Sequence, residues 1–181
     1  MNVLVLVGSL RQGSDNRMLA DAAVGHLPAG VTATVWERLA ELPHYSEDID
    51  GGAAPATARD LRRAVTEADA LLVVTPEYNG SLPGVLKNAI DWLSRPRAAA
   101  ALAGKPTAVL AATRSPRGAQ WAREDAVRIL GVAGASVVEP TFGIAHAHEA
   151  FAEGRLADPV VDSAVRELVR ALTLAVAAAA A

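Results

Sequence analysis

Apolar and polar positions along the chain follow two alternating patterns. Continuous apolar runs, which are typical of strands covered on both faces, alternate with segments whose apolar positions recur at helical spacing. The runs predict five strands, at residues 2–7, 31–36, 70–74, 106–112 and 135–138. Helices are predicted around residues 16–27, 57–68, 85–93 and 122–133, and from 159 onward. This order predicts an α/β fold with a doubly wound parallel sheet, and right-handed crossovers favour the strand order 2-1-3-4-5.

Length and composition favour one domain over residues 1–181. Half of the chain (51%) is hydrophobic and 20% is charged, as in a globular protein, and no repeat or linker divides it. Residues 175–181 are nearly all alanine, so we expect a helix extension or a frayed end there. Residues 37–56 contain prolines and glycines with little periodicity and predict a long loop, and such loops are often functional.

Charge and residue content exclude several classes of function. The net charge of −3 provides no basic field for a polyanion, so we expect no nucleic-acid partner. The chain has no cysteine, which excludes thiolate catalysis, disulfides and cysteine-ligated metals. With no charged leader and no apolar span near 18 residues, we expect a cytoplasmic protein without a membrane segment. His146 and His148, near Glu149, are either a metal pair or a surface pair; the surface pair is favoured because no third ligand is evident.

A polar loop at Thr75–Gly84 lies between a predicted strand and a predicted helix. In open α/β sheets, ligands bind at the carboxyl ends of the strands, which is where this loop falls. Its backbone amides, the Asn79 carboxamide and the Tyr78 ring suit a flat heterocycle that forms hydrogen bonds. The alternative is an ordinary strand-to-helix turn in which Tyr78 packs and Ser81 caps the helix.

The loop after the first strand has the chemistry of an anion site. Ser9 and Ser14 offer hydroxyl groups, Arg11 a positive charge, and Asn16 an amide at a helix start, where backbone amides and the helix dipole favour phosphate. The alternative is ordinary helix capping, with Arg11 solvated.

Two familiar phosphate motifs are nearly matched but fail at one residue each. The spacing of Gly8 and Gly13 fits a P-loop, but Ser14 stands where the lysine is required. Leu10 occupies the second glycine position of the dinucleotide fingerprint, where a pyrophosphate needs close backbone approach. A monophosphate therefore fits this loop better than a nucleoside triphosphate or a pyrophosphate.

Together, the segments 8–16 and 76–92 resemble the NADPH-dependent FMN reductase family. The shared residues are Gly-Ser-Leu-Arg-x-x-Ser-x-Asn in the first segment and Pro-Glu-Tyr-Asn-Gly-Ser-x-Pro-Gly-x-Leu-Lys-Asn-Ala-Ile-Asp-Trp in the second. The resemblance implies a flavodoxin-like three-layer sandwich that binds FMN and uses NADPH or NADH as hydride donor. It also implies a homodimer or homotetramer.

By position, the resemblance implies roles for individual residues. The residues expected to bind the FMN phosphate are Ser9, Arg11, Ser14 and Asn16. Arg17 completes the cofactor-binding residues expected around the first loop. The isoalloxazine would be lined by Pro76, Glu77, Tyr78, Asn79 and Gly80, and its pyrimidine end would face Ser115 and the amides around Gly118.

The third loop, residues 113–119, departs from the glycine-rich form that the family often has. Pro116 removes an amide donor. Arg114 and Arg117 either stabilise charge on reduced flavin, contact the NADPH phosphate, or point into solvent.

The resemblance implies an oxidoreductase in which FMN carries hydride from NAD(P)H to a small-molecule acceptor such as a quinone, an azo compound, chromate or free flavin. No side chain needs to act as a nucleophile, so no catalytic residue is assigned. The alternatives are a flavodoxin-like electron carrier, a flavin-supplying partner of a monooxygenase, and a flavin-free interaction protein. The long loop with His44 and Tyr45 would either cover the flavin or join a dimer contact.

Overall fold

A central parallel sheet organises the computed structural model, which describes residues 1–179. Its strand order is β2-β1-β3-β4-β5, with every neighbouring pair parallel, so the predicted fold class and strand order are confirmed. The strands are β1 (Asn2–Val7), β2 (Thr32–Val35), β3 (Ala70–Thr75), β4 (Pro106–Ala112) and β5 (Ser136–Val137).

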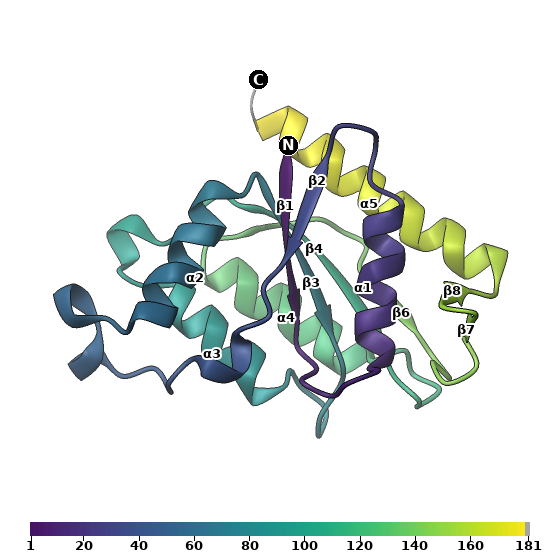
Figure 1. Ribbon diagram of the computed structural model, residues 1–181, viewed down its shortest axis with the longest axis horizontal. Helices are drawn as coiled ribbons and strands as arrows, with labels where there is room; N and C mark the ends of the chain where they lie inside the picture. The colour runs from purple at the N-terminus through teal and green to yellow at the C-terminus, as the bar shows by residue number, and fades with distance from the viewer. Residues whose placement is uncertain (180–181) are drawn as a thin grey trace.

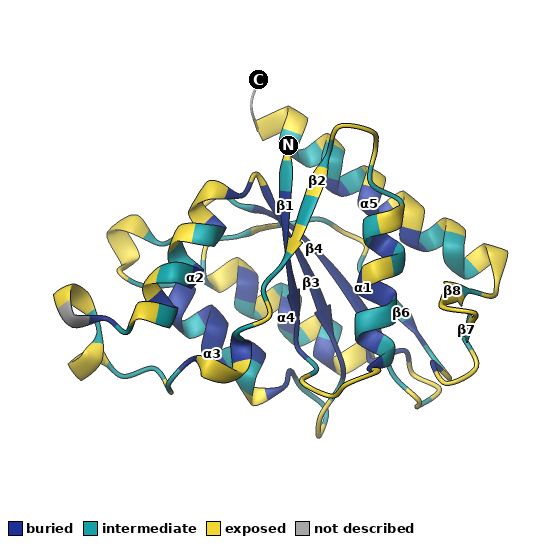
Figure 2. Ribbon diagram, viewed as in Figure 1, coloured by how far each residue is buried: buried dark blue, intermediate teal, exposed yellow. Residues whose placement is uncertain are grey.

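Helices cover both faces of this sheet and give three layers (Figure 1). One face carries α1 (Asp15–Gly25) and α5 (Pro159–Ala179). The other carries α2 (Ala56–Glu67), α3 (Gly84–Leu93) and α4 (Gln120–Val132). Every residue of β3 and β4 is buried, which explains their uninterrupted apolar sequences (Figure 2).

Most element ends agree with the sequence patterns to within two residues. Helix α1 ends at Gly25 rather than residue 27. At the start of α5, the Asp158 carboxylate accepts from the Val160 amide at 2.7 Å, as expected of an N-cap before Pro159. The alanine-rich segment extends α5 as far as Ala179, and residues 180–181 lie outside the described part. None of the helices within residues 1–179 is long and apolar enough to cross a lipid bilayer.

The edge of the sheet beyond β4 is more complex than predicted. Strand β5 is shorter than residues 135–138 and pairs only with the start of β4, while an unpredicted strand, β6 (Phe142–Ile144), pairs with the end of β4. Pro140, which has no amide proton, lies between them, so the edge cannot continue as one ladder. A small hairpin of β7 (Phe151–Ala152) and β8 (Arg155–Leu156) was also not predicted, because two-residue strands leave no periodicity.

The segment from 37 to 56 is a long connection between β2 and α2, as predicted, and it contains three short 3₁₀ turns. Two side chains of α3 hold it. The Asn88 carboxamide accepts from the Tyr45 amide at 2.9 Å and donates to the Pro43 carbonyl at 3.0 Å, and the Trp92 indole donates to the same carbonyl at 2.8 Å. The Tyr45 ring packs edge-on against Trp92, with the ring centres 5.0 Å apart.

A second anchor ties this segment to α2. The Arg62 guanidinium donates to both Asp50 carboxylate oxygens, at 2.8 and 2.9 Å, and to the Trp92 carbonyl at 2.9 Å. Hydrogen bonding from Arg62 lowers the pKa of Asp50 below its ordinary value. The loop is thus fastened against α2 and α3 by half-buried polar contacts.

Candidate functional site

Three loops meet at the carboxyl edge of the sheet, the lower edge in Figure 1. They follow β1, β3 and β4, and a cavity of about 190 Å³ lies among them. Its lining includes seven residues that the sequence predicts for a flavin site, namely Ser9, Arg11, Ser14, Asn16, Pro76, Glu77 and Tyr78. The two matched motifs therefore face one cavity.

The first loop leads into the N-terminus of α1. Ser14 is its N-cap: the side-chain oxygen accepts from the Asn16 amide at 3.2 Å, and the hydroxyl keeps its own proton for another acceptor. Ser14 is only 1% exposed although it lines the cavity. Within the described chain, the amides of residues 9–13 donate to no protein acceptor. These groups suit a small anion.

Asn16 joins the first loop to the third. Its side-chain nitrogen Nδ2 donates to the Ala112 backbone carbonyl at 2.9 Å, and its side-chain oxygen Oδ1 accepts from the Ala112 backbone amide, also at 2.9 Å. Ala112 is the last residue of β4, so this buried pair fixes α1 against the strand from which the third loop departs. The resemblance implies a phosphate contact for Asn16, but in this structure both polar atoms of its side chain already have protein partners.

Arg17 does not line the three-loop cavity. Its guanidinium donates to Glu37 at 2.6 Å and to Asp21 at 3.2 Å. It lines a second cavity on the β2 side of the first loop.

The second loop contains a tight turn. Tyr78 and Ser81 form a reciprocal backbone pair, with N···O distances of 3.0 and 3.1 Å, around Asn79 (φ 51°) and Gly80 (φ 76°). Positive φ at both central residues is the geometry of a type I′ turn, for which Asn-Gly is the preferred sequence. The turn leaves Tyr78 52% exposed beside the cavity, and Asn79 and Gly80 lie outside the lining.

Glu77 links the second loop to α4. Its carboxylate accepts from the Ala122 amide at 3.1 Å, in the first turn of that helix. The N-cap of α4, Ala119, has a positive φ of 52° and no side chain able to cap, so Glu77 supplies this function from another part of the chain. The resemblance implies that Glu77 lines the isoalloxazine, and no local pattern signals a cap from 45 residues away.

The third loop packs against β6, which the sequence did not predict. A Cβ on Gly118 (φ 57°) would come within 2.8 Å of the Gly143 carbonyl oxygen, so only glycine fits there. The Ser115 carbonyl accepts from the His146 amide at 3.3 Å. Neither Ser115 nor Gly118 lines the 190 Å³ cavity, whereas Thr113 and Arg114 do.

Charged side chains of both signs line the cavity, namely Arg11, Arg114, Asp15 and Glu77. The Arg11 and Arg114 guanidinium groups each lie 3.6 Å from the Asp15 carboxylate. Arg117 is directed elsewhere, with its guanidinium carbon 4.6 Å from the centre of the Trp121 ring. Of the two arginines whose roles the sequence left open, Arg114 therefore lies at the cavity and Arg117 stacks on an aromatic ring.

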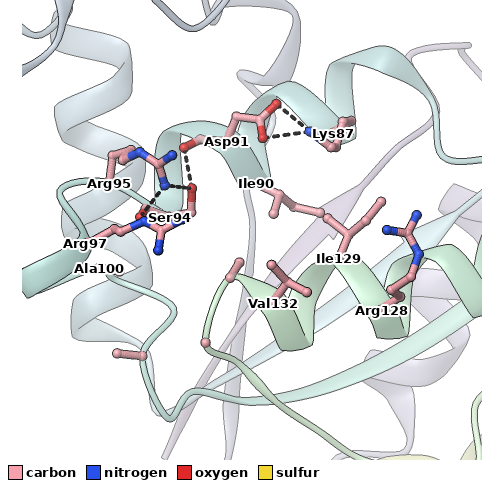
Figure 3. A pocket seen from close by; sticks show the side chains of 13 residues that line it. Lys87, Ile90, Asp91, Ser94, Arg95, Arg97, Ala100, Arg128, Ile129 and Val132 are labelled. Atoms are coloured by element: carbon pink, nitrogen blue, oxygen red, sulfur yellow. Dashed lines mark hydrogen bonds and ion pairs between the residues drawn. The ribbon is translucent and has the colours of Figure 1, made fainter. Parts of the chain in front are cut away.

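Two other features lie outside the three-loop cavity: a larger groove and a pair of histidines. A groove of about 550 Å³ runs between α3 and α4, lined by Ile90, Ile129 and Val132 and by the Lys87–Asp91 ion pair (Figure 3). The His146 and His148 rings lie 6.3 Å apart on the surface, and the described residues hold no cluster of three metal-binding side chains.

A family model described as NADPH-dependent FMN reductase matches residues 1–149. The chain belongs to this family. Its three-loop cavity thus lies where the two motifs of this FMN reductase family meet, and the predicted resemblance is confirmed.

Three proteins are similar to this chain, over different shares of its length. A quinone reductase of Pseudomonas putida is 48% identical over 109 residues, which are 60% of this chain and only 58% of that protein. An NAD(P)H-dependent FMN reductase of Pseudomonas aeruginosa is 37% identical over 178 residues, 96% of this chain and 94% of that protein. The structure of FerB, a flavoenzyme NAD(P)H:(acceptor) oxidoreductase from Paracoccus denitrificans, has a TM-score of 0.88 and 31% identity, and covers 97% of this chain and 96% of its own.

Proposed function

We propose that this protein is an FMN-dependent NAD(P)H oxidoreductase that reduces a small organic acceptor, with quinones as the first class to test. The observation that carries the proposal is the single cavity that unites the two family motifs, beside the uncapped amides of the first loop. Relatives similar to this chain include proteins named quinone reductase and NAD(P)H-dependent FMN reductase.

The donor set fits the phosphate of FMN. Buried Ser14 has a hydroxyl proton to donate, the amides of residues 9–13 are available, and Arg11 supplies charge at the mouth. In this proposal, Ser9 adds a second hydroxyl, and Arg17 serves the neighbouring cavity rather than the phosphate.

The second and third loops would hold the flavin ring. Pro76 and Tyr78 offer the apolar and aromatic wall, and Arg114 adds a guanidinium group to the lining. Asn79, Gly80, Ser115 and Gly118 lie just outside the present lining, and we propose that they border the ring rather than its phosphate. Asn16 and Glu77 act as positioning residues, because each fastens one loop of the site to another element.

Bound FMN would supply reversible two-electron chemistry, which amino-acid side chains lack. The chain itself needs only to bind, orient and expose one face of the ring. No side chain at the cavity is assigned a covalent role.

The assembly of the protein is part of the proposal. Val132 is 83% exposed and Trp121 48% exposed, both on α4, and the groove between α3 and α4, which mixes apolar and charged side chains, lies on the same helix layer. We propose that two copies pair through this α3–α4 face into a homodimer, or a homotetramer built from such dimers. We further propose a cytoplasmic protein that acts on small molecules without binding nucleic acid. Light scattering at micromolar concentration tests the assembly, and a strict monomer would contradict it.

Anaerobic reduction tests the enzyme proposal. The FMN-loaded protein is mixed with NADPH and separately with NADH while the visible flavin absorption is followed, and benzoquinone is then added. We expect rapid bleaching by at least one donor and recovery of colour with the quinone. Protein that binds FMN but bleaches no faster than free FMN would be an electron carrier instead. Protein that binds no FMN would rule out a flavoprotein.

A further inference from the structure

An arginine stacked on a tryptophan lies where the third loop enters α4. The Arg117 guanidinium carbon is 4.6 Å from the centre of the Trp121 ring, and Trp121 belongs to the first turn of the helix. Both residues are exposed, Trp121 to 48%. Tryptophan and arginine are among the residue types most enriched where binding energy is concentrated. Neither side chain lines the α3–α4 groove, so the proposed pairing of two copies through that groove does not itself require the stack.

Contacts with the second loop place the stack next to the proposed flavin site. The Trp121 ring packs on Gly80, where a Cβ would come within 3.3 Å of the ring atom Cε3. Gly80 belongs to the same tight turn as Tyr78, which lines the three-loop cavity and is 52% exposed. The Ala122 amide, which follows Trp121, donates to the Glu77 carboxylate of the cavity lining. Trp121 thus lies against the turn that carries the exposed Tyr78 ring.

The charge of Arg117 is the least compensated among the arginines of this region. The Arg11 and Arg114 guanidinium groups each lie 3.6 Å from the same carboxylate, that of Asp15. Arg117 pairs with no carboxylate among residues 1–179 and stacks on Trp121 instead. Stacking uses only the face of a guanidinium group, so the N–H donors at its edge remain available to an anion.

The three-loop cavity is too small to hold a flavin and an acceptor together. Its volume of about 190 Å³ is below the range of about 300–1,000 Å³ that is typical of small-ligand sites. An acceptor must therefore extend over the exposed surface beside the cavity. The Tyr78 ring offers an aromatic contact to a planar molecule there, and the Arg117 edge suits sulfonate or carboxylate oxygens.

We infer that Arg117, held in place by Trp121, is a specificity residue that favours planar acceptors carrying a negative charge, such as aromatic sulfonates. The inference rests on the proposed function, because it takes the flavin to occupy the three-loop cavity. Arg117 acts on the binding of the acceptor, and the redox step is that of the proposed function. Its removal should therefore change the KM for a charged acceptor and leave kcat unchanged.

Two acceptors with the same rings and different charge provide the test. The FMN-loaded protein is supplied with NADH, and the kinetics are measured with 1,4-naphthoquinone and with 1,4-naphthoquinone-2-sulfonate. Each variant is compared with the wild type on the same acceptor, which removes the difference in reactivity between the two quinones. Arg117→Gln removes the charge, and Arg155→Gln, at an exposed arginine of the β7–β8 hairpin, is the matched control.

The expected loss is selective for the sulfonate. Arg117→Gln should raise the KM for the sulfonated quinone at least about fivefold and that for the neutral quinone less than about twofold. Trp121→Leu, which frees the guanidinium, should raise the KM for the sulfonated quinone about threefold. Arg155→Gln should leave both KM values as in the wild type.

A ligand that accepts no electrons measures binding alone. Naphthalene-2-sulfonate is titrated into the FMN-loaded proteins by calorimetry, and Arg117→Gln should bind it at least about fivefold more weakly than Arg155→Gln does. Added salt should reduce this difference, because it screens an exposed charge.

The outcomes separate the inference from the function on which it rests. A loss confined to the sulfonated ligands in Arg117→Gln supports the inference. Equal behaviour of Arg117→Gln and Arg155→Gln, or an equal loss with both quinones, would overturn it. A rise confined to the KM for NADPH, measured with the neutral quinone, would assign Arg117 to the phosphate of the donor and would also overturn it. A wild-type protein that reduces neither quinone would instead contradict the proposed function.

Discussion

Replacing Asn16 by alanine should destabilise the folded protein as well as the proposed flavin site. The Asn16 carboxamide makes two hydrogen bonds of 2.9 Å with the backbone of Ala112, and it is 4% exposed. Alanine removes both bonds and leaves the buried amide and carbonyl of Ala112 without these partners. Water cannot easily replace them, because Ala112 is only 2% exposed.

The size of the effect follows from the two bonds and the groups they leave behind. Each net hydrogen bond contributes about 1 kcal/mol, and an unsatisfied buried backbone group costs about 1–3 kcal/mol. We therefore expect Asn16→Ala to lower the free energy of unfolding by about 3 kcal/mol. With a urea m value of about 2 kcal/mol/M, the denaturation midpoint would fall by about 1.5 M.

Urea denaturation of the apoprotein, followed by far-UV circular dichroism, measures this shift without any contribution from ligand. Asn2→Ala is the matched control, because the Asn2 side chain makes only an exposed 3.3 Å contact with Thr32; it should change stability by less than about 0.5 kcal/mol. If Asn16→Ala unfolds at the same urea concentration as the wild type but binds FMN more weakly, the reasoning is refuted and Asn16 contacts the ligand directly.

Three further predictions concern the elements around the site. Glu77→Ala removes the cap of α4 at Ala122 and should cost about 1 kcal/mol in urea denaturation; an unchanged midpoint would show that water caps the helix equally well. Gly118→Ala forces a Cβ against the Gly143 carbonyl at positive φ and should lower the melting temperature clearly; a neutral result would show that the loop yields. The pKa of Asp50 is lowered by Arg62, so the stabilisation by this pair is present above the ordinary aspartate pKa and is lost as pH falls through the lowered one. Asp50→Asn should therefore be less stable than wild type at neutral pH and should converge with it in acid; a constant difference would contradict the ion pair.

The sheet and its helices were predictable because their signals are local and repeated. The apolar runs of β1, β3 and β4 reflect burial on both faces, and the strand order follows from handedness once five strands alternate with helices. Strand β6 was missed since Phe142–Ile144 is short, lies beside Pro140, and depends on pairing with the end of β4. The order in residues 37–56 was missed because it comes from distant partners, Asn88, Trp92 and Arg62.

The candidate site was predictable at the level of loops and less so at the level of side chains. Ser9, Arg11 and Tyr78 lie at the predicted cavity, since residues that follow adjacent parallel strands must share an edge. The partners of Asn16, Arg17 and Glu77 depend on tertiary contacts, which one sequence does not reveal.

The central claim is that the first loop holds the phosphate of a flavin, and an FMN titration with Arg11→Ala tests it most directly. Arg155→Ala, at an exposed arginine in the distant β7–β8 hairpin, is the matched control. A charge-assisted contact to phosphate contributes about 1.5–3 kcal/mol, so Arg11→Ala should weaken FMN binding by at least about tenfold without changing the melting temperature of the apoprotein. FMN affinity equal to wild type in Arg11→Ala would contradict the account.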